Sequence, residues 1–340
     1  MKQQWSRREL IGGFGAACLL RGQNGNSFPQ VPSWKTEMRQ LAPNVFAYVQ
    51  AGGPGMMNQG VSNGGLIVGE DHVMVIDSLG APLQSKAFLA AIQKTAPRKP
   101  IRRVLITHHH GDHIWGLPFF PPAEILSHPY CREAMLATPI PSPVWEKRDG
   151  WAAGGEPRKI VPPTSTFDGK LTYHYGNMPV ELVFSGPAHT WGDVMVYLPQ
   201  QKILFAGDVA FYYVAPFAHN GHVTKWIETV ERIQKMDVDV IVPGHGPIGG
   251  KKELAEMAQY LELLKREARK RFDLGLRPGQ AAAQISLGKF DNWIGARDRL
   301  VMNTVRLYHE FDGTLVPDAD TEGMRVAGEE FNATTARGGK

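Results

Sequence analysis

Short runs of apolar residues recur along this chain, and most of them end in a polar or glycine-rich turn. Runs of four to eight residues rich in Val, Ile and Leu are typical of buried strands. The first half of the chain predicts strands at 45–50, 65–68, 73–76, 101–106 and 124–127. The second half predicts strands at 171–175, 180–184, 194–198, 203–205 and 238–242.

Segments with apolar residues three or four positions apart lie between these strands and favour helices. Such spacing predicts helices at 82–95, 130–137, 223–235, 251–272 and 278–308, followed by a polar tail from about Asp312. Two strand-rich halves with helices between them predict a two-layered α/β sandwich.

One long segment, 138–163, is rich in Pro, Gly and Trp and fits no element. Long loops of this kind in compact domains often have a function. We therefore expect it to form a lid over a site, with Trp145 and Trp151 as a candidate apolar wall for a substrate.

The composition is that of a globular protein with a sizeable core, since 43% of its 340 residues are hydrophobic and 21% charged. The net charge of +4 is concentrated only along a helical surface around 265–271, which gives little support to nucleic-acid binding. No stretch has the length and hydrophobicity of a membrane-spanning helix, so stable membrane insertion is not expected. The expected partner is a small-molecule substrate, and the oligomeric state stays open.

The N-terminus carries Arg7 and Arg8 ahead of a short apolar stretch. This pattern predicts a Tat-type signal peptide and linker over 1–26, and hence a periplasmic or secreted protein; a basic tail is the alternative. Lipoprotein anchoring at Cys18 is a less favoured alternative, because Gly15 stands where such sites prefer a larger apolar residue. Cys131 would then be the only cysteine of the mature chain, which excludes an intramolecular disulfide.

The strongest chemical signal directly follows the strand predicted at 101–106 and reads His-x-His-x-Asp-His. Residues two apart on an extended segment point the same way, so His108 and His110 can bind one ion together. Asp112 and His113 lie on the following turn and can serve a second ion. Chance alone would give such a motif in on the order of one chain in a thousand.

Three later apolar runs also end in a potential ligand. His189, Asp208 and His245 each follow a predicted strand through a turn that contains glycine. Zinc favours His nitrogen and carboxylate oxygen. Four strand ends that carry His or Asp therefore predict a metal site at one rim of a sheet.

These motifs resemble those of the metallo-β-lactamase superfamily, over about 45–264. They are similar above all to its glyoxalase II-like branch and to periplasmic relatives found beside quinoprotein dehydrogenases. The resemblance implies a four-layered αββα sandwich over 36–272, with a C-terminal helical extension and polar tail over 273–340. The motifs that carry it are Val75-Ile76-Asp77, His108 to His113, His189-Thr190-Trp191-Gly192-Asp193, Phe205-Ala206-Gly207-Asp208 and Pro243-Gly244-His245-Gly246.

The same resemblance implies a ligand set for two zinc ions. One ion would be bound by His108, His110 and His189, and the second by Asp112, His113 and His245. Asp208 would bridge both ions, and Asp77 would steady a ligand histidine. Thr190 and Asp193 look like further supporting or turn residues.

These expectations describe an exported dinuclear zinc hydrolase in which a metal-bound hydroxide attacks an ester, lactone, thioester or amide carbonyl. Two ions can lower the pKa of a bound water from 15.7 to about 7. Asp112 and Asp208 are the expected catalytic carboxylates. Tyr212 and His222 follow the bridging carboxylate and are candidates to donate a hydrogen bond to a developing oxyanion, as is His219.

Two other activities stay open. A true β-lactamase is disfavoured by Asp208, because the subclass that uses Asp in place of Cys lacks a bridging carboxylate. An iron-dependent sulfur dioxygenase would use one iron, bound chiefly by the first three histidines, so iron is the alternative to zinc.

Overall fold

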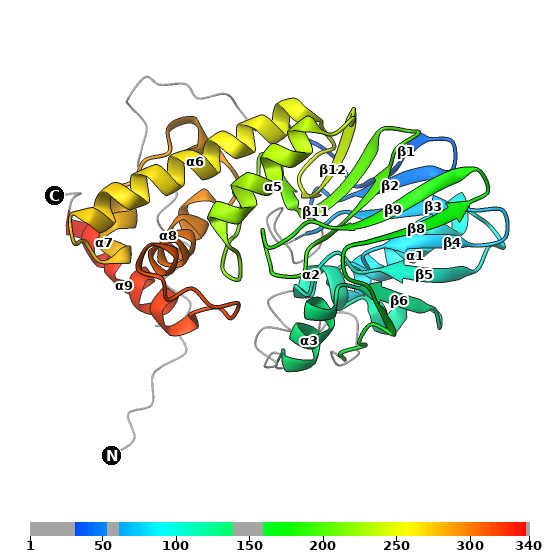
Figure 1. The fold of residues 1–340 in the computed structure, drawn as a ribbon, viewed down its shortest axis with the longest axis horizontal. Helices are drawn as coiled ribbons and strands as arrows, with labels where there is room; N and C mark the ends of the chain where they lie inside the picture. Colours follow the sequence, from blue (N-terminus) through cyan, green and yellow to red (C-terminus); the bar gives the residue numbers. More distant parts are fainter. Residues whose placement is uncertain (1–30, 53–60, 139–158, 338–340) are drawn as a thin grey trace, which may run out of the picture. The chain divides into compact units, whose positions relative to one another are not determined.

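The computed structural model describes residues 31–52, 61–138 and 159–337. The signal peptide expected over 1–26 lies outside the described residues, and so does most of the lid expected over 138–163. The described residues form two β-sheets with helices on their outer sides (Figure 1). No helix among them is long and apolar enough to span a bilayer.

The N-terminal sheet has seven strands in sequence order, β1 to β7. Neighbouring strands from β1 to β4 run antiparallel to one another, and those from β4 to β7 run parallel. The parallel part carries the metal motif, because β5 leads directly into it. The strands are β1 Glu37–Ala42, β2 Val45–Val49, β3 Gly64–Val68, β4 Val73–Ile76, β5 Ile101–Leu105, β6 Glu124–Ser127 and β7 Ser165–Thr166.

The second sheet has five strands in the order β12-β11-β10-β9-β8. All neighbouring pairs are antiparallel except β11 and β12, which run parallel. Asp208 lies on β11 and His245 ends β12, where it pairs with Phe211, so these two neighbouring strands each contribute a side chain at the same edge of the sheet. The strands are β8 Lys170–Tyr175, β9 Met178–Phe184, β10 Val194–Leu198, β11 Ile203–Phe211 and β12 Val240–His245.

Helices cover the outer face of each sheet (Figure 1). The helices α1 and α3 pack on the N-terminal sheet, and α5 and α6 pack on the second sheet. The C-terminal helices α7 to α9 pack on one another and against α6. The helices are α1 Pro82–Thr95, α2 Gly111–Ile114, α3 Pro129–Ala137, α5 Val223–Lys235, α6 Lys251–Asp273, α7 Pro278–Ala283, α8 Ala296–Asp312 and α9 Thr321–Arg337, with 3-10 turns at Leu117–Phe119 and Gly288–Asn292.

Three hydrophobic cores separate these layers. One lies between the sheets and includes Ile76 and Phe205; it is almost fully buried. A second joins the N-terminal sheet to Phe88 of α1, and the third joins the second sheet to Trp226 of α5. The order helix, sheet, sheet, helix confirms the four-layered αββα sandwich.

Several elements differ from the sequence expectation. β11 runs to Phe211 instead of ending at 205, and its register shifts on both sides of Gly207, so Asp208 lies within the strand. The expected helix at 278–308 is broken into α7, a 3-10 turn and α8. The carboxylate of Asp291 accepts hydrogen bonds from the backbone of Leu287 and the hydroxyl of Ser286, which favours a turn over a continuous helix.

The segment expected to be a polar tail contains α9. Only a narrow stripe of this helix is apolar, with Ala327 and Phe331 buried against the third core. Two residues four positions apart are too weak a pattern to predict a helix from sequence. The edge strand β1 was not predicted either, since it alternates charged and apolar residues with only partial burial.

Candidate metal centre

Side chains from both sheets meet at one edge of the sandwich. His108 and His110 follow β5, and the short helix α2 carries Asp112 and His113. The second sheet contributes the remaining three side chains, from the turn after β9, from β11 and from the end of β12: His189, Asp208 and His245. The structure thus brings together all seven residues that the sequence predicted as ligands.

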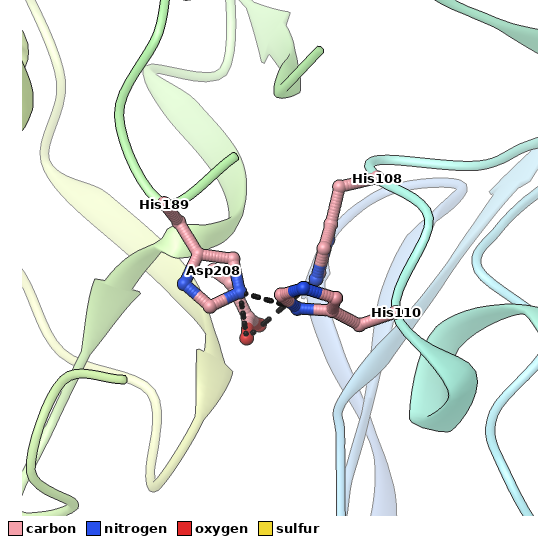
Figure 2. Close-up of side chains that lie close together, drawn as sticks. All are labelled: His108, His110, His189 and Asp208. Carbon is pink, nitrogen blue, oxygen red and sulfur yellow. Dashed lines mark hydrogen bonds and ion pairs between the residues drawn. The ribbon is translucent and has the colours of Figure 1, made fainter. Parts of the chain in front are cut away.

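His108, His110, His189 and Asp208 form the first group, and their ligand atoms all lie within 4.8 Å of one another. Figure 2 shows the three imidazole rings and the carboxylate converging on one point. Nδ1 of His110 lies 2.7 Å from Nε2 of His189, and Oδ2 of Asp208 lies 3.2 Å from the same Nε2. Such a set of three imidazoles and one carboxylate suits a zinc or iron ion.

Asp112, His113 and His245 form the second group, again within 4.8 Å. Nε2 of His245 lies 3.1 Å from Oδ2 of Asp112, and Nε2 of His113 lies 3.6 Å from the same oxygen. Two imidazoles and a carboxylate leave room for further ligands on an ion, which a catalytic site needs.

Asp208 joins the two groups. Its Oδ1 lies 3.1 Å from Nε2 of His113, and its Oδ2 lies 3.2 Å from Nε2 of both His189 and His245. This close approach requires glycine at position 244, because a Cβ there would lie 1.8 Å from Oδ1 of Asp208. A carboxylate between two groups of imidazoles is positioned to bridge two ions.

A buried carboxylate behind the cluster orients two of the histidines. Asp77 accepts hydrogen bonds from Nδ1 of His113 at 2.8 Å and from the Thr107 hydroxyl at 2.9 Å. The same hydroxyl lies 3.1 Å from Nδ1 of His108. Since an imidazole that donates through Nδ1 keeps its lone pair on Nε2, both rings present Nε2 to the cluster.

Several ligand atoms of the cluster have no hydrogen-bond partner outside it among the described residues. Nε2 of His108 is buried without a hydrogen bond, and Nε2 of His113 and Oδ1 of Asp208 are buried with no hydrogen-bond partner other than each other, at 3.1 Å. Leaving one such group unsatisfied costs about 1–3 kcal/mol, more when it is charged. Cations bound at the two groups would satisfy all three, so the residues fit the metal ions that the resemblance implies.

The two groups differ in their protonation. Burial holds the pKa of His108 and His110 well below the ordinary value and lowers the pKa of His189 to about 4. Burial also acts on His113, but the carboxylates of Asp208, Asp112 and Asp77 together raise its pKa well above the ordinary value. The three histidines of the first group are therefore neutral and ready to bind a cation beside the ionised Asp208, whereas binding at the second group must displace a proton.

The cluster is accessible mainly at two positions. The side chain of Asp112 is 25% exposed and His110 is half-buried, whereas the other five side chains are buried. Burial acts to raise the pKa of Asp112, but the nearby His113 and the hydrogen bond from His245 have the larger combined effect and lower the pKa below its ordinary value. The carboxylate is therefore ionised at neutral pH. A substrate can therefore reach the cluster beside Asp112.

Two predicted catalytic residues do not join the cluster. The Tyr212 side chain is buried, and its hydroxyl donates to the carbonyl oxygen of Gly250 at 3.0 Å, so it does not face the cluster. His222 begins α5, and its Nδ1 lies 3.4 Å from Oε2 of Glu310. It lines a separate cavity of about 960 Å³ that Trp191 also lines. Both residues follow Asp208 in sequence, but their side chains point away from the cluster, although His219 and Asn220 between them contact His110.

Other predicted residues have different outcomes. His219 stacks on the ring of His110, with 4.4 Å between the centroids. Asp193 accepts hydrogen bonds from the amide and hydroxyl of Thr190 and so supports the turn that carries His189. Trp145 and Trp151 lie outside the described residues. Sequence reasoning missed Asn220, whose Oδ1 lies 3.1 Å from Nε2 of His110, because a single asparagine in a loop carries no signal of its own.

Comparison with known families identifies the class of protein. The model of the metallo-beta-lactamase superfamily matches residues 57–245, which is more than half of the chain and contains the whole cluster. The chain therefore belongs to the metallo-beta-lactamase superfamily. It is a superfamily hydrolase with a His/Asp site that can hold metal.

Individual relatives are distant from this chain. The alpha subunit of 2,4-dinitroanisole O-demethylase from Nocardioides sp. (strain JS1661) is 29% identical over 53% of this chain and 51% of its own length. Metallo-beta-lactamase type 2 from Bacillus cereus is 26% identical over 66% of this chain and 81% of its own length.

Among solved structures, the inverting sec-alkylsulfatase Pisa1 from Pseudomonas sp. has a similar fold, with a TM-score of 0.63 and 17% identity. The match covers 82% of this chain and 51% of that one. The chain thus spans about half the length of the demethylase subunit and of the alkylsulfatase.

Proposed function

We propose that this protein is a dinuclear zinc hydrolase that cleaves an ester, lactone, thioester or amide bond in a small molecule. The position of Asp208 carries the proposal, because its two oxygens lie within 3.2 Å of imidazoles from both groups. When bound, two divalent ions would lower the pKa of a water to about 7 and polarise the substrate carbonyl. No serine or cysteine nucleophile is then needed.

The residues in and around the cluster have different roles. Asp208 holds the two groups of histidines at a fixed separation. Asp77 orients the ring of His113 by a direct hydrogen bond and the ring of His108 through the Thr107 hydroxyl. Asp112 is the carboxylate with accessible surface, so it is placed to accept a proton from the attacking water and pass it to the leaving group.

The substrate approaches from the side of Asp112 and His110. Neutral imidazoles surround His110, namely His109 and His219, and both have a buried Nδ1 without a partner. We also infer that the protein acts after export, on the strength of the twin arginine at Arg7 and Arg8.

A second candidate is the hydrolysis of sulfate esters. The similarity to the sec-alkylsulfatase covers 82% of this chain, so it extends beyond the sandwich into the C-terminal helices. A sulfate ester, like a carboxylic ester, has an oxygen that an ion can polarise and a leaving group that needs a proton.

Elemental analysis of the purified protein tests the metal part of the proposal. Close to two zinc ions per chain would support it, and about one iron per chain would point instead to the sulfur dioxygenase. A substrate panel then tests the reaction, with lactones, thioesters, nitrocefin as a β-lactam, and secondary alkyl sulfates. Turnover of the alkyl sulfates alone would replace the carbonyl substrate by a sulfate ester, and turnover of nitrocefin alone would favour the β-lactamase.

A further inference from the structure

His110 uses its two ring nitrogens for different purposes. Its Nδ1 lies 2.7 Å from Nε2 of His189, inside the first group of ligands. Its Nε2 lies 3.1 Å from Oδ1 of Asn220, outside that group. A neutral imidazole carries one N–H and one lone pair, so only one of its two tautomers can bind an ion through Nδ1.

The Asn220 amide selects that tautomer. Its Nδ2 donates to the carbonyl oxygen of Pro317 at 3.1 Å. Because a carbonyl oxygen only accepts, the amide group that faces Pro317 must be the NH₂, and the group that faces His110 must be the oxygen. That oxygen also only accepts, so Nε2 of His110 must carry the proton and Nδ1 must carry the lone pair.

The loop that carries Asn220 is fixed by α8. The side chain of Asn303, which is fully buried, donates to the carbonyl of Pro216 at 2.8 Å and accepts from the amide of Ala218 at 2.8 Å. Nε of Arg306 donates to the carbonyl of Gly221 at 2.5 Å. The residues on both sides of Asn220 are therefore attached to the same helix.

Arg306 also fixes the partner of Asn220. Its guanidinium donates to the carbonyls of Val316 at 2.6 Å and Asp318 at 3.0 Å, the two neighbours of Pro317. Its exposure is only 1%, and burial lowers its pKa to about 10, so it keeps its charge at neutral pH. One buried side chain thus sets the distance between Asn220 and the carbonyl that orients it.

The same loop supports a second ligand of the first group. Gly221 packs so closely on the turn after β9 that a Cβ would lie 2.8 Å from the carbonyl oxygen of Ala188 and 3.1 Å from that of His189. The amide of His222 donates to the carbonyl of Ala188 at 2.9 Å. Movement of this loop would therefore shift His110 and His189 together.

We propose that Asn220 is a positioning residue that holds His110 in the Nε2–H tautomer, and that α8 fixes Asn220 through Arg306. This assigns the C-terminal helices a part in metal binding, although they lie outside the residues 57–245 that the family model matches. The proposal rests on the metal site but not on the proposed reaction, so metal binding alone can test it.

Two substitutions of nearly equal size distinguish the effect of the hydrogen-bond acceptor from the effect of side-chain shape. Asn220→Asp keeps an oxygen that accepts from His110, and Asn220→Leu removes it. Both are compared with the parent in a His245→Gln background, which weakens the second group and isolates the first. The readouts are the zinc dissociation constant by chelator competition, the visible absorption spectrum of the Co²⁺-loaded protein, and the melting temperature of the metal-free protein. Asn332→Ala, on the exposed side of α9, is the matched control.

We expect Asn220→Leu to weaken zinc binding by about 10–100-fold, the usual effect of removing a partner of a ligand histidine, and to change the Co²⁺ spectrum. Asn220→Asp should bind zinc at least about tenfold more tightly than Asn220→Leu. Unchanged zinc affinity and an unchanged spectrum in Asn220→Leu would overturn the proposal. Equal losses in both variants would also overturn it, because the acceptor would then make no difference. A lower melting temperature of the metal-free protein without a change in affinity would show a purely structural role, which contradicts the proposal.

Discussion

The Asp77 carboxylate accepts a hydrogen bond from Nδ1 of His113 at 2.8 Å, with both side chains almost fully buried. The two residues follow neighbouring parallel strands: Asp77 comes directly after β4, and His113 lies in the helix α2 after β5. Their pairing leaves Nε2 of His113 free to face Asp208 and an ion. The orientation of His113 in the second group of the cluster therefore depends on Asp77, which lies outside both groups.

Asp77→Asn should weaken binding at the second group by about 10–100-fold. The amide keeps only one of the two acceptor oxygens. Its NH₂ group faces either the Thr107 backbone amide, which donates to Oδ1, or His113 and the Thr107 hydroxyl, which share Oδ2. Asn is the right replacement because Asp77 has a φ of 59°, a conformation that Asn tolerates. Stepwise zinc dissociation constants check this, with the exposed Asp71→Asn as control. Two unchanged constants would contradict the expected role.

Asp208→Ala should lower the zinc content from two ions toward one and reduce kcat/KM at least about 100-fold, since a bridging carboxylate contributes several kcal/mol and each 1.36 kcal/mol is tenfold. The variant removes the group that lies next to four imidazoles. Elemental analysis and steady-state kinetics measure both effects, and Asp239→Asn on the surface serves as control. Full metal content with unchanged kinetics would refute the bridging role.

Removal of the metal ions should destabilise the protein. Ions that bind only the folded state stabilise it by about 4 kcal/mol at a free concentration 1,000 times the dissociation constant. We expect the Tm to fall by on the order of 10 °C after treatment with a chelator, and to recover when zinc is added. Differential scanning calorimetry with and without zinc measures this. An identical Tm in both states would mean that the cluster does not bind zinc in the folded protein.

Tyr212→Phe should lower stability without lowering activity. The substitution removes the hydrogen bond to the carbonyl of Gly250, which costs about 1–2 kcal/mol for a buried pair. The hydroxyl does not face the cluster, so kcat should stay within a factor of about two, less than 0.5 kcal/mol in barrier height. Urea denaturation measures the free energy of unfolding, and steady-state kinetics on the same preparation measure kcat. A large loss of kcat with unchanged stability would restore the oxyanion role first expected for this residue.

Cys131 should resist alkylation in the native protein. Its side chain is fully buried against Met135 of the same helix, and burial raises the pKa of the thiol far above its ordinary value. Only the thiolate reacts, so iodoacetamide at neutral pH should label Cys131 only after unfolding. The experiment uses a Cys18→Ser variant and mass spectrometry. Labelling of the native and unfolded protein at similar rates would show that the N-terminal sheet opens readily.

The sequence alone determined the local elements and the ligand types. The helix at 82–95 and the strands at 73–76, 124–127 and 194–198 were predicted with the bounds that the structure has, because their apolar spacing is regular. The seven residues that meet in the cluster could be predicted because His and Asp at strand ends are few, follow a recognisable spacing and resemble the motifs of a known family. Binding by i and i+2 residues is a local property of the backbone, and a sequence displays it directly.

Only the tertiary structure decided what surrounds those ligands. Tyr212 and Asn220 both follow Asp208 within a dozen residues, and nothing in the sequence shows that the first faces Gly250 and the second faces His110. Their roles depend on contacts between residues about 40 to more than 100 positions apart, which a local pattern does not encode. The hydrogen bonds of Arg306 to Gly221, Val316 and Asp318 likewise depend on the tertiary structure. All three of these partners are backbone carbonyls. Every residue has one, so the sequence does not show which carbonyls will accept from Arg306.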